Sequence, residues 1–425
     1  MRAWLTRPID SSGLRAFRVL FGLVLAGGAV RTLASGWIEK LYVEPRFFFT
    51  YWGFDFIHPL PHAGMIAVYV ALAALGIAIA AGFHTRLAAA LFFVGFSYTQ
   101  LIDVTNYLNH NYLISLLALL LALLPVNTRT VPAWFHYAFR LQVAVVYIYA
   151  GLTKLGSDWL LHGEPLATWL SVHTDLPLIG PLLDERWVAL GASWAGFLFD
   201  TTIVAWLLYP RTRRIAYLVL IGFHTATYAL FSIGLFPFVM TAAATVFFET
   251  TWARRLLRTL PVAGRRLPVA GLLFPLVATH LAVQIALPLR HLLYPGGVLW
   301  NEEGMRFAWK VMVREKHGAV TFHVTQPSTG RTVQVSPHRY LTAKQEREMS
   351  SQPDLILQLA HHIADDFRAR GFGDVEVRAE ALVSLNARPP SPMIDPTVDL
   401  AGEHDSLAPK TWILPAPEGP PGARP

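Results

Sequence analysis

The chain contains no cysteine in 425 residues, and charged residues make up only 15% of it. The absence of thiols excludes disulfide bonds, thiolate catalysis, iron–sulfur clusters and cysteine-ligated zinc. HExxH, Walker and GxGxxG patterns are also absent, so the sequence predicts no metal site. Soluble proteins contain roughly 25% charged residues, whereas 54% of this chain is hydrophobic. This composition is typical of a membrane protein, and lipid is its first expected partner.

Apolar runs occupy most of residues 1–288. They lie at about 13–33, 64–83, 87–102, 111–125, 139–155, 188–208, 214–231, 235–248 and 270–288. About 20 apolar residues in a helix span the hydrocarbon of a bilayer. The first run is longer than the roughly 7–15 apolar residues of a signal peptide. We therefore predict about nine transmembrane helices, the first of them retained at the N-terminus.

The basic residues fall in short clusters between the apolar runs. One set is Arg2, Arg7, Arg86, Arg129, Arg211, Arg213, Arg214, Arg254, Arg255, Arg258, Arg265 and Arg266; the alternate connections hold only Lys40, Arg46 and Arg186. Basic loops stay in the cytoplasm, so the N-terminus is expected inside and everything after about residue 289 outside. The net charge of +7 thus reflects topology, and no nucleic-acid partner is expected. The expected location is the inner (plasma) membrane of a bacterium.

The pattern changes near residue 304, where a soluble domain is expected. Residues 307–313 and 320–325 alternate like strands, 328–330 form a turn and 332–335 return as a hairpin partner. Residues 354–370 are amphipathic as a helix and 375–385 read as another strand. We predict a β-rich α+β domain over residues 289–407. The proline-rich segment 408–425 is expected to be disordered.

The first candidate site is the polar segment 103–112, which lies between two apolar runs. If the segment is helical, Asp103, Asn106 and His110 share one face and form an amide and imidazole cluster. The alternative is an interfacial loop whose polar side chains cap helix ends and whose Tyr107 and Tyr112 belong to an aromatic belt. The residues alone leave both interpretations open.

The second candidate is Lys154, which closes an otherwise apolar helix. A lysine near a helix end commonly extends its ammonium to the membrane interface. Alternatively, Tyr147 and Gly151 on the same face open a cavity in which a desolvated Lys154 acts as a base. Asp200, His224 and Gln284 are weaker candidates, because polar groups at membrane depth normally face the protein interior.

Ordered motifs across about 390 residues resemble the vitamin K-dependent γ-glutamyl carboxylases and their bacterial homologues with a horizontally transferred transmembrane (HTTM) domain. The similarity lies in residues 7–10, 17–22, Asp103 with 109–113, 146–159, 231–236, 287–291, Trp300, 309–313, 384–386 and 394–399. With the composition, it implies a mainly α-helical polytopic membrane protein of about nine transmembrane helices. The C-terminal extracytoplasmic domain is expected to be β-rich α+β.

The resemblance also implies a reaction. Lys154 matches the family's catalytic base, which takes a proton from vitamin K hydroquinone; His110 matches a histidine that assists it, and Asn109 is the neighbour of that histidine. Oxygen then reacts with the quinol, and the strong base that results removes a γ-proton from a peptide glutamate, to which CO₂ adds. His291 matches a histidine that matters for activity at the start of the luminal domain. Tyr147, Gly151, Tyr112, His291, Trp300 and Trp309 are expected around the quinol, and no metal is required.

Two alternatives remain open. Gly304, Met305 and the segment 313–317 differ from the animal pattern in the region expected to hold the peptide, which suggests epoxidation of a naphthoquinol without carboxylation. The second alternative is a non-catalytic membrane protein that serves in transport or assembly. A transporter would be expected to show an internal repeat, and the sequence contains none that we can find.

Overall fold

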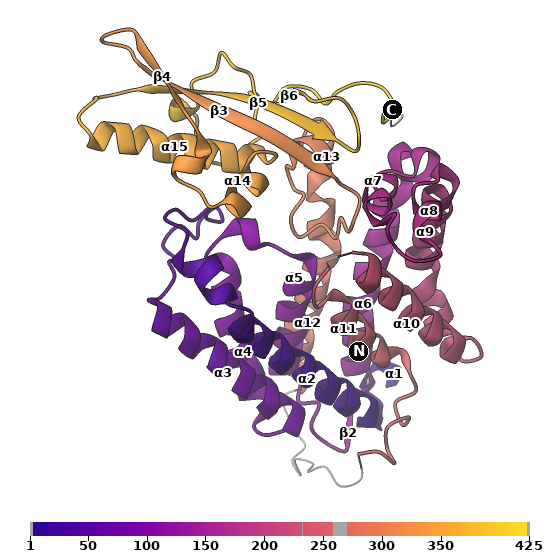
Figure 1. The fold of residues 1–425 in the computed structure, drawn as a ribbon. Helices are drawn as coiled ribbons and strands as arrows, with labels where there is room; N and C mark the ends of the chain where they lie inside the picture. The colour runs from indigo at the N-terminus through magenta and orange to yellow at the C-terminus, as the bar shows by residue number, and fades with distance from the viewer. Residues whose placement is uncertain (1–2, 232, 258–269, 423–425) are drawn as a thin grey trace.

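The computed structural model describes residues 3–231, 233–257 and 270–422. Arg2, Arg258, Arg265 and Arg266 of the basic set, and Ser232, lie outside the described residues. A bundle of helices forms one part of the molecule, and a domain containing a β-sheet covers one end of it (Figure 1).

Each of the predicted apolar runs is helical. The corresponding helices are α2 (Ser12–Ala34), α3 (His62–Ala81), α4 (Thr85–Leu101), α5 (Asn109–Leu123), α6 (Ala133–Leu152), α9 (Arg186–Leu208), α10 (Arg213–Leu230), α11 (Phe236–Ala244) and α12 (Ala270–Ala286). Short helices are α1 (Ala3–Thr6), α7 (Leu166–Leu170), α8 (Gly180–Leu183) and α13 (Val298–Asn301).

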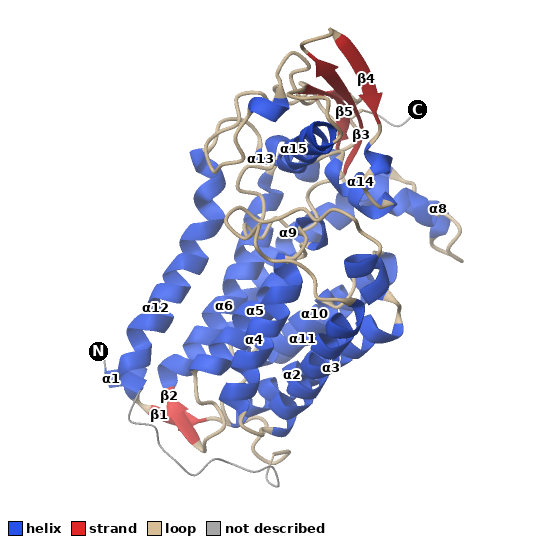
Figure 2. Ribbon diagram, turned by 90° about the vertical axis from the view of Figure 1, so that its left-hand side faces the viewer, coloured by secondary structure: helices blue, strands red, loops and turns tan. Residues whose placement is uncertain are grey.

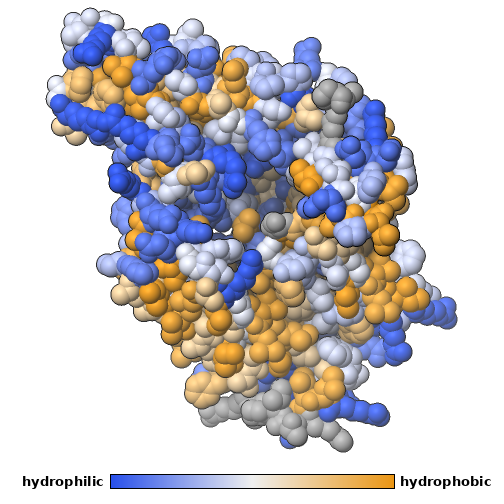
Figure 3. All heavy atoms as spheres, in the orientation of Figure 1, coloured by the Kyte–Doolittle hydropathy of each residue, from blue (hydrophilic) through white to orange (hydrophobic). Residues whose placement is uncertain are grey.

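The number of membrane crossings stays a prediction. Within the described ranges, four helical segments are long and apolar enough to span a bilayer, Ser12–Ala34, His62–Ala81, Arg186–Leu208 and Gly271–Leu293. Helices α5, with 15 residues, and α11, with 9 residues, are too short to cross alone, since a straight crossing needs about 20. Hydrophobic side chains gather on the helical part of the face in Figure 3, as lipid contact requires.

A small sheet holds the N-terminus against the bundle. Strand β1 (Pro8–Asp10) pairs antiparallel with β2 (Thr130–Pro132), and Ile9 lies opposite Val131. Figure 2 shows this pair at the end of the bundle opposite the larger sheet. The N-terminus and the C-terminal domain therefore lie at opposite ends of the helices.

The C-terminal domain is a four-stranded antiparallel sheet in the order β4-β3-β5-β6. Its strands are β3 (Lys316–Gln326), β4 (Arg331–Val335), β5 (Glu376–Leu385) and β6 (Ser391–Pro392). Helices α14 (Ala343–Met349) and α15 (Pro353–Ala369) lie against one face of the sheet (Figure 1). Alternate residues of β5 are buried because one face meets α15 and the other faces solvent. The predicted hairpin, amphipathic helix and last strand are confirmed.

The prediction of a strand at residues 307–313 is wrong. Phe307, Trp309 and Met312 have φ of 65°, 54° and 56°, whereas a strand needs φ near −120°. The apolar side chains of this segment instead pack in separate places. Trp309 is 0% exposed within the core of the bundle, and the ring of Phe307 contacts those of Tyr107 and Tyr112. The alternation reflects a loop with buried side chains.

The segment 408–422 is placed against the domain, contrary to the disorder expected there; residues 423–425 of that prediction lie outside the described residues. Trp412 is 3% exposed, Ile413 forms a β-bridge with Ile394, and the Leu414 N–H donates to Met393 O over 2.9 Å. The three consecutive apolar residues 412–414 pack against the domain. The prediction of disorder rested on the proline content of the whole segment and overlooked them. The neighbouring prolines are compatible with an edge segment, where an N–H group can be dispensed with.

The polar segment 103–108 contains only a single 3₁₀ turn, η2 (Val104–Asn106), so the predicted helical cluster of Asp103, Asn106 and His110 is wrong. The capping interpretation holds for Asp103, which caps this turn. Asp103 Oδ1 accepts from the Thr105 N–H, and Oδ2 accepts from Gln345 Nε2, both over 2.8 Å. Gln358 also exchanges two 3.0 Å bonds with the backbone of Thr50. These side chains attach α14 and α15 to the helical part.

Close contact between α2 and α3 depends on two glycines. A Cβ on Gly22 would lie 2.7 Å from Gly76 O, and one on Gly76 would lie 2.7 Å from Ala26 N. The backbones therefore approach closely, as small residues allow in membrane helices.

Gly22→Ala is expected to destabilise the protein by about 1–3 kcal/mol through overpacking. Gly27→Ala, in the same helix, is the control, because its Cβ would have nothing within 4 Å; it should leave stability unchanged or raise it by up to about 1 kcal/mol through helix propensity. Thermal unfolding in detergent measures both. Equal midpoints for the two variants would contradict this account of the packing.

Candidate active site

Lys154 is buried in a 3₁₀ turn (Thr153–Leu155) that directly follows α6. Its residue is 4% exposed, and Nζ donates to Asp200 Oδ2 over 2.8 Å, to Ala150 O over 3.0 Å and to Val311 O over 3.3 Å. All three acceptors belong to the protein, so the ammonium does not extend to the membrane interface. Lys154 and Tyr147 line a cavity, as the second interpretation expects, whereas Gly151 does not; the action of Lys154 as a base stays a prediction.

Gly151 brings Asp200 within reach of Lys154. A Cβ at Gly151 would lie 2.6 Å from Thr201 Cγ2 and 3.0 Å from Thr201 N. Helices α6 and α9 therefore touch at this glycine, one turn from the lysine. Gly151 contributes to the site by allowing the contact, and it does not itself line the cavity.

A cavity of about 230 Å³ lies beside Lys154. Its walls are almost entirely apolar and include Val146, Trp159, Leu170, Phe223, Phe231 and Met240. The polar side chains that line it include Lys154, Asp200, Tyr147 and His224, and Lys154 Nζ stands 5.0 Å from the centre of the Trp159 ring. A pocket of this kind binds an apolar ligand and orients it by few polar contacts.

Tyr147 and His224 form a second polar pair in this cavity. The Tyr147 hydroxyl and His224 Nε2 are 3.0 Å apart, and both residues are buried. His224 Nδ1 has no hydrogen-bond partner among the described residues. Because buried polar atoms are normally paired, this nitrogen is a candidate contact for a bound ligand.

Two family models match the chain in sequence. The model of the HTTM domain matches residues 6–252, and that of the vitamin K-dependent gamma-carboxylase lumenal domain matches residues 270–419. The chain belongs to the vitamin K-dependent γ-carboxylase family. The matches support a carboxylase-like function, and the family implies dependence on vitamin K hydroquinone. No solved structure matches the chain.

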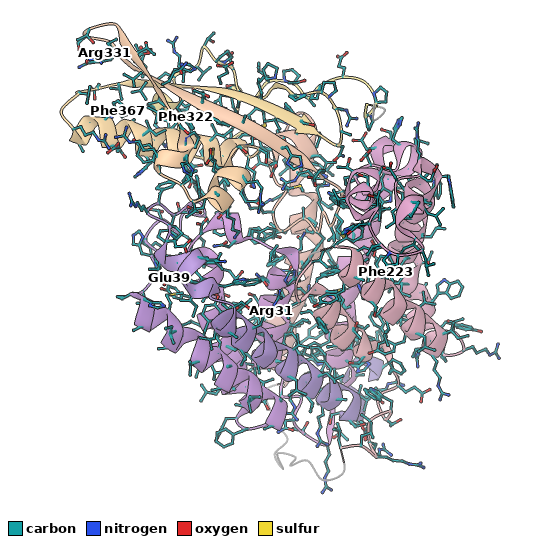
Figure 4. All side chains as sticks on the ribbon, in the orientation of Figure 1. Arg31, Glu39, Phe223, Phe322, Arg331 and Phe367 are labelled. Atoms are coloured by element: carbon teal, nitrogen blue, oxygen red, sulfur yellow. The ribbon has the colours of Figure 1, made fainter. Side chains whose placement is uncertain are left out.

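The two other catalytic residues expected in this family member line different cavities. His110 lines one of about 730 Å³ between α2, α3, α4 and α5, and Asn109 lines another. The Phe236 ring stands edge-on to the rings of both His110 and His224. The distances between ring centres are 6.2 Å to His110 and 5.5 Å to His224. Figure 4 places Phe223, from the Lys154 cavity, well apart from Arg31, from the His110 cavity.

Of the residues expected around the quinol, only Tyr147 lines the cavity at Lys154. Tyr112 donates to Gln284 Oε1 over 2.8 Å and stacks on Trp309. Trp300 belongs to the core of the C-terminal domain, and its Nε1 donates to Leu414 O. His291 Nδ1 is 2.8 Å from Pro288 O, which fixes the orientation of its ring.

Two residues of this family member gain importance from the structure. Asp200 was a weak candidate in the sequence, and its partner could not be read there, because 46 residues separate it from Lys154. Lys310, whose Nζ donates to the Thr153 hydroxyl over 3.3 Å beside Lys154, was not singled out, since it stands in a segment that alternated like a strand. Among the described residues, no group of three or more side chains could ligate a metal ion.

Asp200→Asn is expected to destabilise the protein by about 3–5 kcal/mol, because it leaves the buried Lys154 charge without its counter-ion. Adding Lys154→Met should restore a large part of the loss, since the double variant has no buried charge. The two side chains are 4% and 10% exposed. A double-mutant cycle by thermal unfolding measures the coupling. An Asp200→Asn variant as stable as the wild type would show that the pair carries little energy.

Proposed function

We propose that the protein oxidises a vitamin K-type hydroquinone with O₂ to its epoxide and couples this reaction to γ-carboxylation of a peptide glutamate. The observation that carries the proposal is the amine of Lys154, which is hydrogen-bonded to Asp200 in the lining of a largely apolar cavity. Family membership supports it independently.

The residues present fit a naphthohydroquinone. The cavity offers apolar and aromatic walls to the fused rings, and two polar pairs, Lys154 with Asp200 and Tyr147 with His224, to hydroxyl groups. The unpartnered His224 Nδ1 supplies a further polar contact. A lipid-soluble quinol can reach such a cavity from the bilayer.

In the proposed reaction Lys154 takes the proton of a quinol hydroxyl. The amine needs its lone pair for this step, and Asp200 Oδ2, 2.8 Å away, offers the existing proton a neighbouring place to move to. A bound quinol would supply, on reaction with O₂, the base that removes the γ-proton of the glutamate, and CO₂ would then add to the carbon that lost the proton. The apolar walls exclude water, which would otherwise quench such a base.

His110 and Asn109 remain supporting residues in the proposal. The Phe236 ring lies between His110 and His224, so any help that His110 gives to Lys154 acts across this ring. His291, Trp300, Trp309 and Tyr112 do not line the Lys154 cavity, and in the proposal they stabilise the junction between the helical part and the C-terminal domain.

We also propose that the N-terminus is cytoplasmic and the C-terminal domain extracytoplasmic, in a bacterial inner membrane. The basic connections support this orientation, and the family model that matches residues 270–419 is that of a lumenal domain. A glutamate-bearing substrate would then reach the site from outside.

Epoxidation without carboxylation is the second candidate. Gly304 stands where the animal pattern has a leucine, and a Cβ here would lie 2.8 Å from His291 Cα. The position has no space for the larger side chain, so the peptide region is built differently. No described feature favours the transport or assembly alternative.

Lys154→Ala and Lys154→Arg are both expected to lower epoxide formation by about 10²–10⁴-fold, the typical contribution of a general base. Arginine is the matched control, because it retains a positive charge for Asp200 but stays protonated. The assay supplies reduced vitamin K, O₂, labelled bicarbonate and a glutamate-rich peptide to protein in detergent.

Epoxide with fixed label from the wild type would support the full reaction, and epoxide alone would favour the second candidate. Neither product from folded protein would overturn both. An arginine variant with more than a tenth of the wild-type rate would refute Lys154 as the base.

A further inference from the structure

A cavity of about 330 Å³ lies at the end of the bundle opposite the C-terminal domain. Its lining includes Ile9 of β1 and Ala133 at the start of α6, and Figure 2 shows β1 and β2 at this end. It shares no lining residue with the Lys154 cavity. The orientation proposed above puts this end in the cytoplasm, so the cavity is separate from the proposed quinol site.

The lining of this cavity is rich in positive charge. Arg7, Arg140 and Arg213 belong to it, and Glu249 is its acidic residue among those the structure describes. The Glu249 carboxylate is 3.9 Å from Arg213 Nη1, and its side chain is 73% exposed. Three guanidinium groups therefore face one exposed carboxylate, which leaves an excess of positive charge that an anionic ligand would balance.

Backbone carbonyls fix two of these arginines. Arg140 donates three bonds of 2.9–3.0 Å to the carbonyl oxygens of residues 246–248. Arg213 donates bonds of 2.9 and 3.0 Å to those of residues 207 and 208. These carbonyls end two helical segments, where a cation is favourable. The bonds use Nε and Nη2 of each arginine, and Arg140 Nη1 donates to no residue in the described ranges.

His136 is a second, independent sign of a ligand. It lines the same cavity and lies one turn before Arg140, on the same face of α6. The residue is 2% exposed, and neither ring nitrogen has a hydrogen-bond partner among the described residues. Val246 O lies near the ring, but it accepts from Arg140 Nε over 2.9 Å. Because buried polar atoms are normally paired, the imidazole is a candidate contact for a bound ligand.

We propose that this cavity binds a phosphate group, with Arg7, Arg140 and Arg213 as charged donors and His136 as a further donor. Guanidinium groups match the geometry of phosphate oxygens. Three of them, opposed by Glu249 alone, suit a doubly charged phosphate monoester better than a single carboxylate. The phosphate belongs either to a lipid headgroup of the adjoining leaflet or to a soluble ester, because the recognising chemistry is the same for both.

The test is isothermal titration calorimetry of the full chain in a non-ionic detergent at pH 7. The three probes are dihexanoyl phosphatidic acid, glycerol 3-phosphate and dihexanoylglycerol, which carry the phosphate with chains, the phosphate alone and the chains alone. At least one phosphate probe is expected to bind more tightly than dihexanoylglycerol. Similar affinity for the two phosphate probes would assign the site to a soluble ester, and tighter binding of phosphatidic acid would assign it to a lipid. Binding of neither phosphate probe above the level of dihexanoylglycerol would overturn the proposal.

Two exposed side chains test the charge of the cavity without removing a structural bond. Arg7 is exposed, and its hydrogen bonds to Ala3 and Ala133 are made by its backbone. Arg7→Gln should weaken binding of the phosphate probe by about fivefold, the usual contribution of one basic residue near an anionic surface, and Arg7→Lys should retain most of the affinity. Glu249→Gln should tighten binding by a similar factor, because it removes the opposing charge.

Arg129→Gln is the matched control. Arg129 is also exposed and directly precedes β2, so the variant loses the same charge at the same end of the bundle, but it does not line the cavity. It should bind the phosphate probe as the wild type does. Equal weakening by Arg7→Gln and Arg129→Gln would show a diffuse attraction and overturn the site. An Arg7→Gln variant with unchanged affinity, or a Glu249→Gln variant with no gain, would also overturn it.

Discussion

The buried ion pair between Lys154 and Asp200 is the interaction on which the site depends. An ammonium and a carboxylate in an apolar bundle are stable only when paired and hydrogen-bonded. Here the contact of 2.8 Å joins the 3₁₀ turn Thr153–Leu155, which follows α6, to α9. Gly151 permits that contact because any side chain would collide with Thr201. Both residues of the pair also line the apolar cavity.

The C-terminal domain and the bundle share the site. Val311 O completes the bonds of Lys154, and the segment around it separates an apolar cavity from a polar one. Three positive φ angles, at Phe307, Trp309 and Met312, bend this segment so that its side chains enter both parts of the protein. Strained backbone of this kind persists only where the surroundings hold it. The bend is therefore consistent with a segment that shapes both cavities.

The sequence predicted the elements well where periodicity decides them. Each apolar run became a helix, and the hairpin, α15 and β5 lie where their patterns indicated, because burial on one face leaves a readable period. The segment 307–313 and the tail after 407 were misread, because single buried aromatic residues such as Trp309 and Trp412 give no period. Lys154 and Tyr147 could be chosen as site residues from charge and family likeness. The pairing with Asp200 and the separate cavity of His110 could not, since both depend on how distant helices pack.

The central claim is that Lys154 removes a proton from a bound quinol, and the most direct measurement is an absorption difference spectrum taken without oxygen. Reduced vitamin K would be added to the protein in detergent at pH 7, and the spectrum of the bound quinol compared between the wild type and Lys154→Arg. The account predicts the spectrum of an ionised quinol in the wild type and of a neutral quinol in the variant. A neutral quinol bound to both proteins would contradict it.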